Sequence, residues 1–175
     1  MTVRPAHVEA DLIDSVCSRV RQRLPGEQAS PCESFVRQYY HRVPAEDLAA
    51  RDPLDLSGAA VAHWNVAQQR LPGRAKVRVD NPALERHGWK SAHTVLEIVT
   101  DDMPFLVDSV TMELGRQGYS IDLMIHPVIR VRRDQRGALR AAAPEILTDV
   151  FASSQLGTAT TRTHSFVRCL LRCRC

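Results

Sequence analysis

One short segment carries the residue types best suited to a ligand site. It reads Asp101-Asp102-Met103-Pro104-Phe105 and lies between a stretch with strand character and a stretch with helical periodicity. Loops that lead into the start of a helix are common ligand sites, because backbone amides there face outward. Asp102 can equally cap the helix that Pro104 begins. Both interpretations stay open, and these five residues are the candidate ligand or interface residues.

The cysteines and histidines form no recognisable catalytic or metal-binding pattern. Cys169, Cys173 and Cys175 offer three thiolates, but zinc sites usually join two short-spaced ligand pairs, and no second pair is present. The seven histidines are dispersed and have no carboxylate or cysteine at a characteristic spacing. Gly-rich phosphate loops and nucleophile motifs are also missing from the sequence. We therefore predict no catalytic, cofactor-binding or metal-binding residue, and no cofactor, for this chain.

The composition is that of a soluble globular protein. The chain has 175 residues, of which 44% are hydrophobic and 25% charged. No apolar run approaches the roughly 18–20 residues needed to cross a membrane. The first helix-like stretch contains Glu9, Asp11 and Asp14, which excludes a signal peptide. Five cysteines without disulfide-like spacing suit a reducing compartment, so we expect a cytoplasmic protein without membrane contact.

The net charge of +3 comes from the C-terminal end of the chain. Four arginines and no acidic residue follow position 150, which leaves 19 basic and 20 acidic groups before it. A protein that binds nucleic acid needs a basic face on its folded part, and nothing here supplies one. We therefore expect no nucleic-acid partner.

Residues 1–72 have the pattern of a helical segment. Apolar residues repeat every four positions over 8–24, and Pro25-Gly26 ends that helix. A second helix is predicted over 33–42 and a short third one after Pro44. Asp52-Pro53 has the form of a cap and first turn of a fourth helix, which Pro72-Gly73 closes.

Residues 73–140 change to a mixed pattern of strands and one helix. A short strand is predicted over 75–79, and a central strand over 94–100, which is apolar on both faces. A helix over 104–117 follows, and then a long alternating strand over 121–131. Pro127 lies inside that strand, which indicates an edge position or a bulge.

The signal weakens after Gly137. We predict a linker and a possible last strand over 141–167, with a helix-like stretch at 144–150 and a strand beginning at Ser165. Residues 168–175 are rich in arginine and cysteine and follow no structural period, so we expect a tail there.

Several blocks of the sequence identify a family resemblance. The main ones are Asp-Asp-Met-Pro-Phe-Leu-Val-Asp-Ser from Asp101 and Ile-His-Pro-Val-Ile-Arg-Val-Arg-Arg from Ile125, preceded by Tyr39-Tyr40, Ala45-Glu46-Asp47-Leu48, His63-Trp64 and residues 76–82. Over about residues 35–137 the chain closely resembles the N-terminal region of the large bacterial NAD-specific glutamate dehydrogenases. The long ungapped block makes the resemblance specific.

The resemblance implies a regulatory role and no chemistry for this chain. The N-terminal part of those enzymes is similar to ACT modules, βαββαβ units associated with amino-acid sensing and assembly. The family converts L-glutamate to 2-oxoglutarate with NAD as the acceptor, but no position here matches its catalytic or NAD-binding motifs. NAD is thus a cofactor of the parent enzyme, and the expected partners are a second copy or the remainder of that enzyme.

Two departures from the ACT pattern matter. Ordinary ACT modules have Asp-x-Pro-Gly-Leu at the effector loop, and here Phe105 replaces the glycine, so its ring should obstruct a ligand and favours a packing role. The resemblance is lost after Val167, which suggests a truncated or frameshifted product whose tail lies outside the fold. A missing second helix would leave one sheet face uncovered and favour a marginal or dimeric protein.

These observations together predict an α+β fold. A helical N-terminal segment should precede an incomplete ACT-like unit with a mainly antiparallel sheet. The favoured function is the regulatory or assembly fragment of an NAD-specific glutamate dehydrogenase, inactive by itself. The alternatives are a stand-alone module that senses an amino acid or docks on a partner, and a non-functional truncated product.

Overall fold

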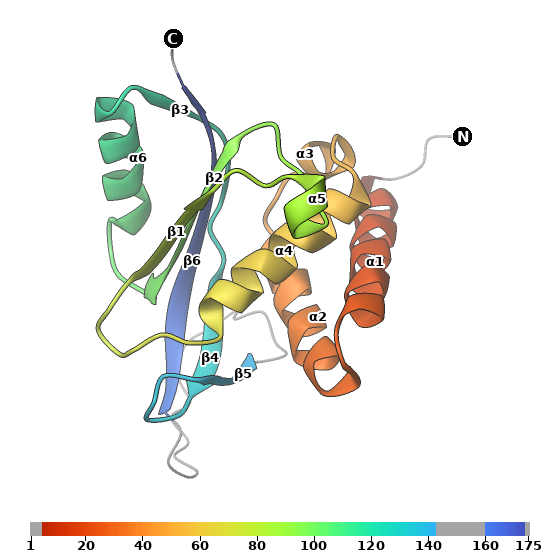
Figure 1. Ribbon diagram of the computed structural model, residues 1–175, viewed down its shortest axis with the longest axis horizontal. Coiled ribbons are helices and arrows are strands. Elements are labelled where there is room, and N and C mark those ends of the chain that lie inside the picture. The colour runs from red at the N-terminus through yellow and green to blue at the C-terminus, as the bar shows by residue number, and fades with distance from the viewer. Residues whose placement is uncertain (1–4, 143–159, 174–175) are drawn as a thin grey trace.

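A layer of helices stands against a six-stranded antiparallel sheet in the computed structural model, which describes residues 5–142 and 160–173 (Figure 1). The helical layer consists of α1 (Pro5–Arg23), α2 (Gly26–Tyr40), α3 (Ala45–Ala49) and α4 (Pro53–Ala67). The remaining elements are β1 (Lys76–Asp80), α5 (Leu84–His87), β2 (Thr94–Asp101), α6 (Leu106–Arg116), β3 (Tyr119–Ile125), β4 (Val128–Arg133), β5 (Leu139–Ala142) and β6 (Thr160–Cys173). The α+β fold class with a mainly antiparallel sheet is confirmed.

The helices α1–α4 lie where the sequence predicts them, with shifted boundaries, whereas the short helix α5 was not predicted. α2 begins at Gly26 rather than at residue 33 and contains Pro31. The predicted cap of α4 is present, because the Asp52 carboxylate accepts a hydrogen bond from the Leu54 amide at 2.7 Å. Pro53 occupies the first position of that helix, where its missing N–H has no intrahelical partner to lose.

The strand β6 lies in the middle of the sheet. The strands run in the order β1-β2-β6-β4-β5, and β3 also pairs with β6. All of β2 pairs with one edge of β6, from Thr94 opposite Leu171 to Asp101 opposite His164. On the other edge, β3 pairs with the C-terminal half of β6 and β4 with its N-terminal half.

The expectation of a tail outside the fold is therefore wrong for residues 168–173. These residues continue β6, and the side chains from Arg168 to Leu171 are buried. The segment looks polar in sequence because Arg168 is buried beside the carboxylate of Glu97, and it shows no alternation because both of its faces are covered. Its central position makes this segment part of the framework of the sheet.

The predicted strand over 121–131 is divided in two at Pro127. β3 and β4 run one after the other along β6, and the break falls at His126-Pro127. Proline has no N–H for the ladder, but its carbonyl accepts a hydrogen bond from the Phe166 amide at 3.0 Å. The interruption confirms that Pro127 marks an irregularity in the pairing.

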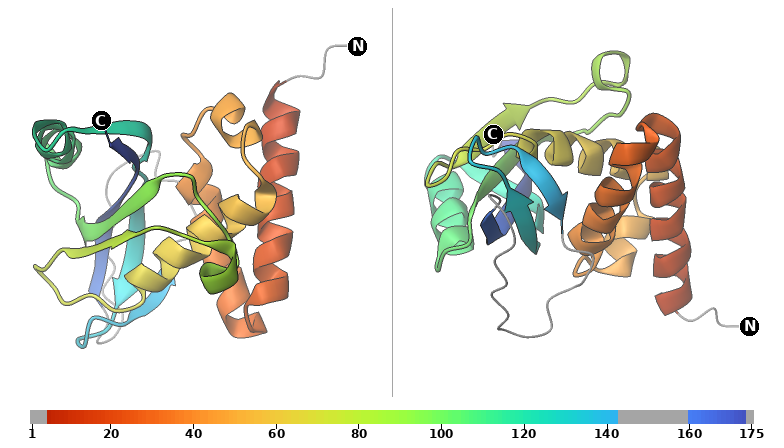
Figure 2. Two further views of the ribbon diagram at one scale, coloured as in Figure 1. Left: turned by 45° about the horizontal axis from the view of Figure 1, so that its top comes forward. Right: turned by 90° about the horizontal axis from the view of Figure 1, so that it is seen from below.

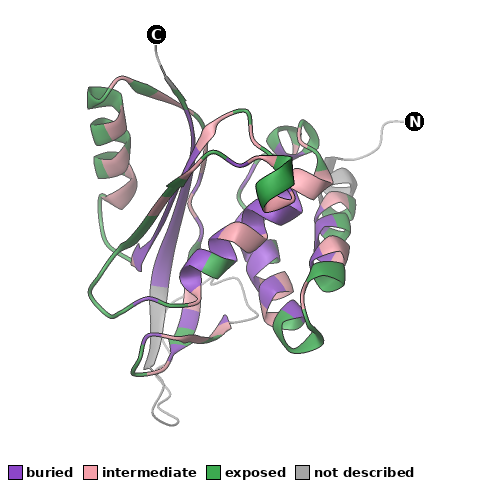
Figure 3. Cartoon of the chain, in the orientation of Figure 1, coloured by how far each residue is buried: buried purple, intermediate pink, exposed green. Residues whose placement is uncertain are grey.

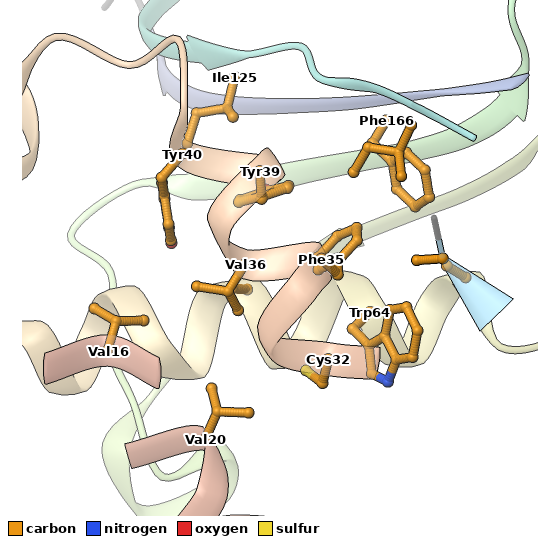
Figure 4. Close-up of a cluster of buried hydrophobic side chains, with 14 of the residues drawn as sticks. Val16, Val20, Cys32, Phe35, Val36, Tyr39, Tyr40, Trp64, Ile125 and Phe166 are labelled. Atoms are coloured by element: carbon orange, nitrogen blue, oxygen red, sulfur yellow. The ribbon is translucent and has the colours of Figure 1, made fainter. Parts of the chain in front are cut away.

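Both faces of the sheet carry a helical cover, of unequal depth. The layer α1–α4 packs on one face, where Phe35 contacts both Phe166 of the sheet and Trp64 of α4 (Figure 4). α6 lies on the opposite face, and Leu106, Val110 and Leu114 pack there against a smaller apolar cluster (Figure 2). The sequence predicts one uncovered face of the sheet, and α6 covers part of that face. The predicted helix at 144–150 lies outside the described residues.

Among the described helices, none has the length and apolarity that a membrane crossing requires.

Candidate functional site

Asp101 ties the end of β2 to the loop that follows α4. Its carboxylate pairs with the guanidinium of Arg70, whose side chain is 2% exposed, and accepts a hydrogen bond from the Gly73 amide at 3.3 Å. Burial by itself would raise the pKa of Asp101, but the hydrogen bond and charge of Arg70 hold it below its ordinary value. Asp101 is therefore an ionised structural clamp.

Asp102 does not cap α6, which corrects one of the two interpretations of this residue. Its Oδ1 instead accepts a hydrogen bond from the Ser165 hydroxyl on β6, at 2.7 Å. The residue in the cap position is Phe105, and no side chain makes a cap hydrogen bond there. Asp102 therefore fixes the loop to the central strand.

Phe105 and Met103 point away from the protein interior. Phe105 is 77% exposed and Met103 is 47% exposed, so the expected packing role of the Phe105 ring is not met within the described residues. Phe105 has φ 61° and ψ 13°, the left-handed region, which costs a non-glycine residue about 1–2 kcal/mol. The loop thus keeps a large apolar ring exposed to water and on a strained backbone.

A cavity that the sequence did not indicate lies between the helical layer and the sheet. It has a volume of about 460 Å³, and its walls include Leu56, Trp89, Leu170 and Arg168. Arg168 is 2% exposed, donates to the Ala59 carbonyl at 2.7 Å, and its guanidinium carbon lies 5.0 Å from the centre of the Trp89 ring. The cavity therefore combines an apolar wall with a buried cation.

The charge of Arg168 belongs to a buried cluster of three residues. Glu97 is 1% exposed and accepts hydrogen bonds from Arg168 at 3.0 Å and from Nε of Arg78 at 2.8 Å. Burial raises the pKa of Glu97, and the two guanidiniums oppose that rise. Glu97 therefore balances the charge of Arg168 inside the chain. The cavity lining itself carries Arg51, Lys90 and Arg168 together with Asp52 and Asp55, so it presents charges of both signs to a ligand.

A second group of charges lies at the edge of the same cavity. Asp122 is approached by Arg172 at 3.3 Å, His93 at 3.6 Å and Arg51 at 3.7 Å. Of these, Arg51 and His93 line the cavity. The four residues come from four separate parts of the chain, so their spacing in sequence gives no signal.

His63 is held as a neutral structural residue. It is completely buried, its Nδ1 lies 3.0 Å from the Tyr39 hydroxyl, and its Nε2 lies 3.3 Å from the Ile98 carbonyl. Burial and the nearby charge of Arg168 lower its pKa to about 3. This environment suits an imidazole with its proton on Nε2, donating to Ile98 and accepting from Tyr39.

Comparison with known proteins gives the family. The profile of "Glutamate dehydrogenase, ACT1 domain" matches residues 35–167, which is more than half of the chain. The chain belongs to this family. It is 43% identical over 136 residues to the NAD-specific glutamate dehydrogenase of Halomonas elongata, and 37% identical over 138 residues to that of Pseudomonas aeruginosa. No solved structure matches the chain.

The chain corresponds to a small part of its relatives. The matched region covers 77% and 78% of this chain, but 8% of the length of each glutamate dehydrogenase. The ACT1 match ends at residue 167, so Arg168 lies just beyond it, although β6 continues to Cys173. Within the described residues of this ACT1-family chain, no group of three or more potential metal ligands comes together.

Proposed function

We propose that this chain acts as a regulatory and assembly module of an NAD-specific glutamate dehydrogenase and catalyses no reaction by itself. The observation that carries this proposal is the match of residues 35–167 to the ACT1 domain, and the chain matches only 8% of the length of each glutamate dehydrogenase. In the whole enzyme, L-glutamate, NAD and water would give 2-oxoglutarate, ammonium and NADH, with NAD bound outside this region. We expect the module to work in the cytoplasm.

The catalytic half of the proposal is tested by incubating the purified chain with L-glutamate and NAD. We expect no NADH absorbance above a blank without protein, and the full-length Halomonas elongata enzyme serves as the positive control. NADH formation that copurifies with the chain would contradict the proposal.

The regulatory half is tested by deleting, from the Halomonas elongata enzyme, the segment that matches this chain. We expect a changed oligomeric state, or a changed response of the rate to added amino acids, because a module of this kind acts through assembly or sensing. An enzyme whose oligomer, rate and amino-acid response all stay unchanged would contradict it.

The cavity beside Arg168 favours a second candidate function, the sensing of a small organic acid or amino acid. Charges of both signs beside an apolar wall fit an amino acid, which carries a carboxylate and an ammonium group. Such a ligand, at about 100 times its dissociation constant, stabilises the folded state by about 2.7 kcal/mol.

A thermal-shift panel of amino acids and matched amines without a carboxylate tests this candidate. Only the acids should raise the midpoint of unfolding. Arg51→Ala, at the wall of the cavity, should reduce that rise, whereas Arg116→Ala, on the exposed side of α6, should leave it unchanged. Equal shifts by acids and amines, or no shift at all, would exclude the site.

A further inference from the structure

The strand β1 forms one edge of the sheet and leaves an apolar surface uncovered. It pairs with β2, and no described strand pairs with its other edge. Val77 and Val79 lie opposite Ile98 and Leu96, so they are on the face that α6 covers. They extend beyond that cover, and are 57% and 62% exposed. The apolar face thus continues without protection to the sheet edge.

The charges of β1 are arranged symmetrically about its centre. The strand reads Lys76-Val77-Arg78-Val79-Asp80, with a cation at one end and an anion at the other. When two copies of such a strand pair antiparallel about Arg78, Lys76 of each copy lies opposite Asp80 of the other. Opposite charges in directly facing positions stabilise a strand pair, and they fix its register.

The central arginine does not oppose this pairing as strongly as its charge suggests. Two copies of Arg78 would face each other, and facing like charges are unfavourable. Each Arg78, however, is already paired with Glu97 of its own chain, on the face of the sheet away from the valines. That ion pair draws the guanidinium over the neighbouring strand and offsets its charge.

We propose that two copies of this chain associate edge to edge through β1, antiparallel and in register about Arg78. The sheet then continues across both copies. Val77 and Val79 of each copy form one apolar strip, with an α6 of each copy on the same side of the sheet. This partner deepens the assembly role proposed above and rests on it. Edge strands with charged residues can instead be protected against pairing, and the test separates the two cases.

The test exchanges the two end charges of β1. Lys76→Asp should place two acidic pairs across the junction, and Asp80→Lys two basic pairs, so each variant alone should raise the dimer dissociation constant about tenfold or more. A mixture of the two variants restores opposite charges at both positions, and so does the double variant. Both should associate as the original chain does, within about threefold. Sedimentation velocity at high micromolar concentrations measures these constants.

Two controls separate this interface from general effects. Arg74→Asp makes the same charge change as Lys76→Asp, just outside the strand, and should leave association unchanged. Asp80 also pairs with His87 at 3.2 Å, so circular dichroism and the unfolding midpoint of Asp80→Lys are checked first. If that variant does not fold, Val77→Lys replaces it and should abolish association by placing a charge in the apolar strip.

Three results would overturn the interface: a monomeric original chain at high micromolar concentrations, a dimer indifferent to Lys76→Asp, or folded single variants that fail to associate when mixed. None of these affects the glutamate assay or the deletion experiment in the Halomonas elongata enzyme. Failure of this interface is therefore distinguishable from failure of the regulatory function.

Discussion

The two faces of the sheet differ in how completely they are covered. On the face toward α1–α4, Phe35 and Phe166 are fully buried and their ring centres lie 5.1 Å apart, while Trp64 is 5% exposed. On the opposite face, no residue of α6 is buried. Figure 3 shows the contrast, with buried residues through α2, α4 and β6, and exposed or intermediate residues along α6.

This difference indicates which face is internal and which is available to a partner. The helical layer encloses an aromatic cluster, and the charges of Arg168 and Glu97 are compensated within the chain. The α6 side leaves apolar side chains at the sheet edge and in the loop before α6, where a second protein surface would remove them from water. The predictions below test this contrast.

The largest difference should come from removing one phenylalanine ring on each side. Phe35→Ala deletes a completely buried ring and should lower the free energy of unfolding by about 3–5 kcal/mol. Phe105→Ala deletes an exposed ring and should change it by less than about 0.5 kcal/mol. Urea unfolding measures both values, and similar losses in the two variants would remove the contrast between the faces.

Glu97→Gln should destabilise the helical side by about 3 kcal/mol, because it leaves the buried guanidinium of Arg168 without a counter-charge. Arg78→Ala should cost less, since that side chain is 37% exposed and Glu97 keeps Arg168 as its partner. Chemical unfolding of both variants tests the order, and a larger loss for Arg78→Ala would contradict the assignment.

Acid should weaken the helical side through His63. Its pKa of about 3 in the folded chain lies below the ordinary value of about 6.5. Between pH 6.5 and pH 3, the unfolded chain therefore binds a proton at this histidine that the folded chain does not bind. The free energy of unfolding is unaffected by this group above about pH 6.5 and decreases as the pH falls below it. Between pH 6.5 and 4.5 the loss is about 2–3 kcal/mol.

His63→Gln removes the titrating group and should flatten this pH dependence, even though the variant is less stable at neutral pH. The difference between the two chains cancels contributions from other groups, such as Asp101, whose own loss occurs at lower pH. Parallel curves for the two chains would show that His63 does not carry the effect.

A small gain in stability is expected from a second change at Phe105 on the α6 side. Phe105→Gly relieves the left-handed backbone of Phe105 and removes a ring from a residue that is 77% exposed, so the chain should become more stable by about 0.5–1 kcal/mol. The flexibility that glycine adds to the unfolded chain limits the gain. A loss of stability on thermal unfolding would show that the ring packs within the chain.

The sequence predicted the elements whose signals are local. The cap at Asp52 and the central strand β2 follow from short-range capping and burial patterns. The C-terminal half of β6 was missed because Arg168 is buried through a partner 71 residues away, which no periodicity reveals. The exposure of Phe105 was missed for a related reason. The sequence does not show whether an apolar residue is buried within its own chain or lies on the surface.

The cavity could not have been predicted in the same way. Its walls come from residues as distant in sequence as Tyr40 and Leu170, and the buried cation in its wall, Arg168, is paired with Glu97 across two strands. In the loop over 101–105, the structure separates the roles of the candidate residues. Asp101 and Asp102 are engaged in internal contacts, and Met103 and Phe105 are the exposed members.

Hydrogen exchange of the original chain, measured at increasing protein concentration, tests most directly whether the α6 side is the one that meets a partner. We predict that the backbone amides of β1 become protected as concentration rises, while exchange in α2 and α4 stays constant. Concentration-independent exchange in β1, or new protection in α2 and α4 instead, would contradict the assignment of the two faces.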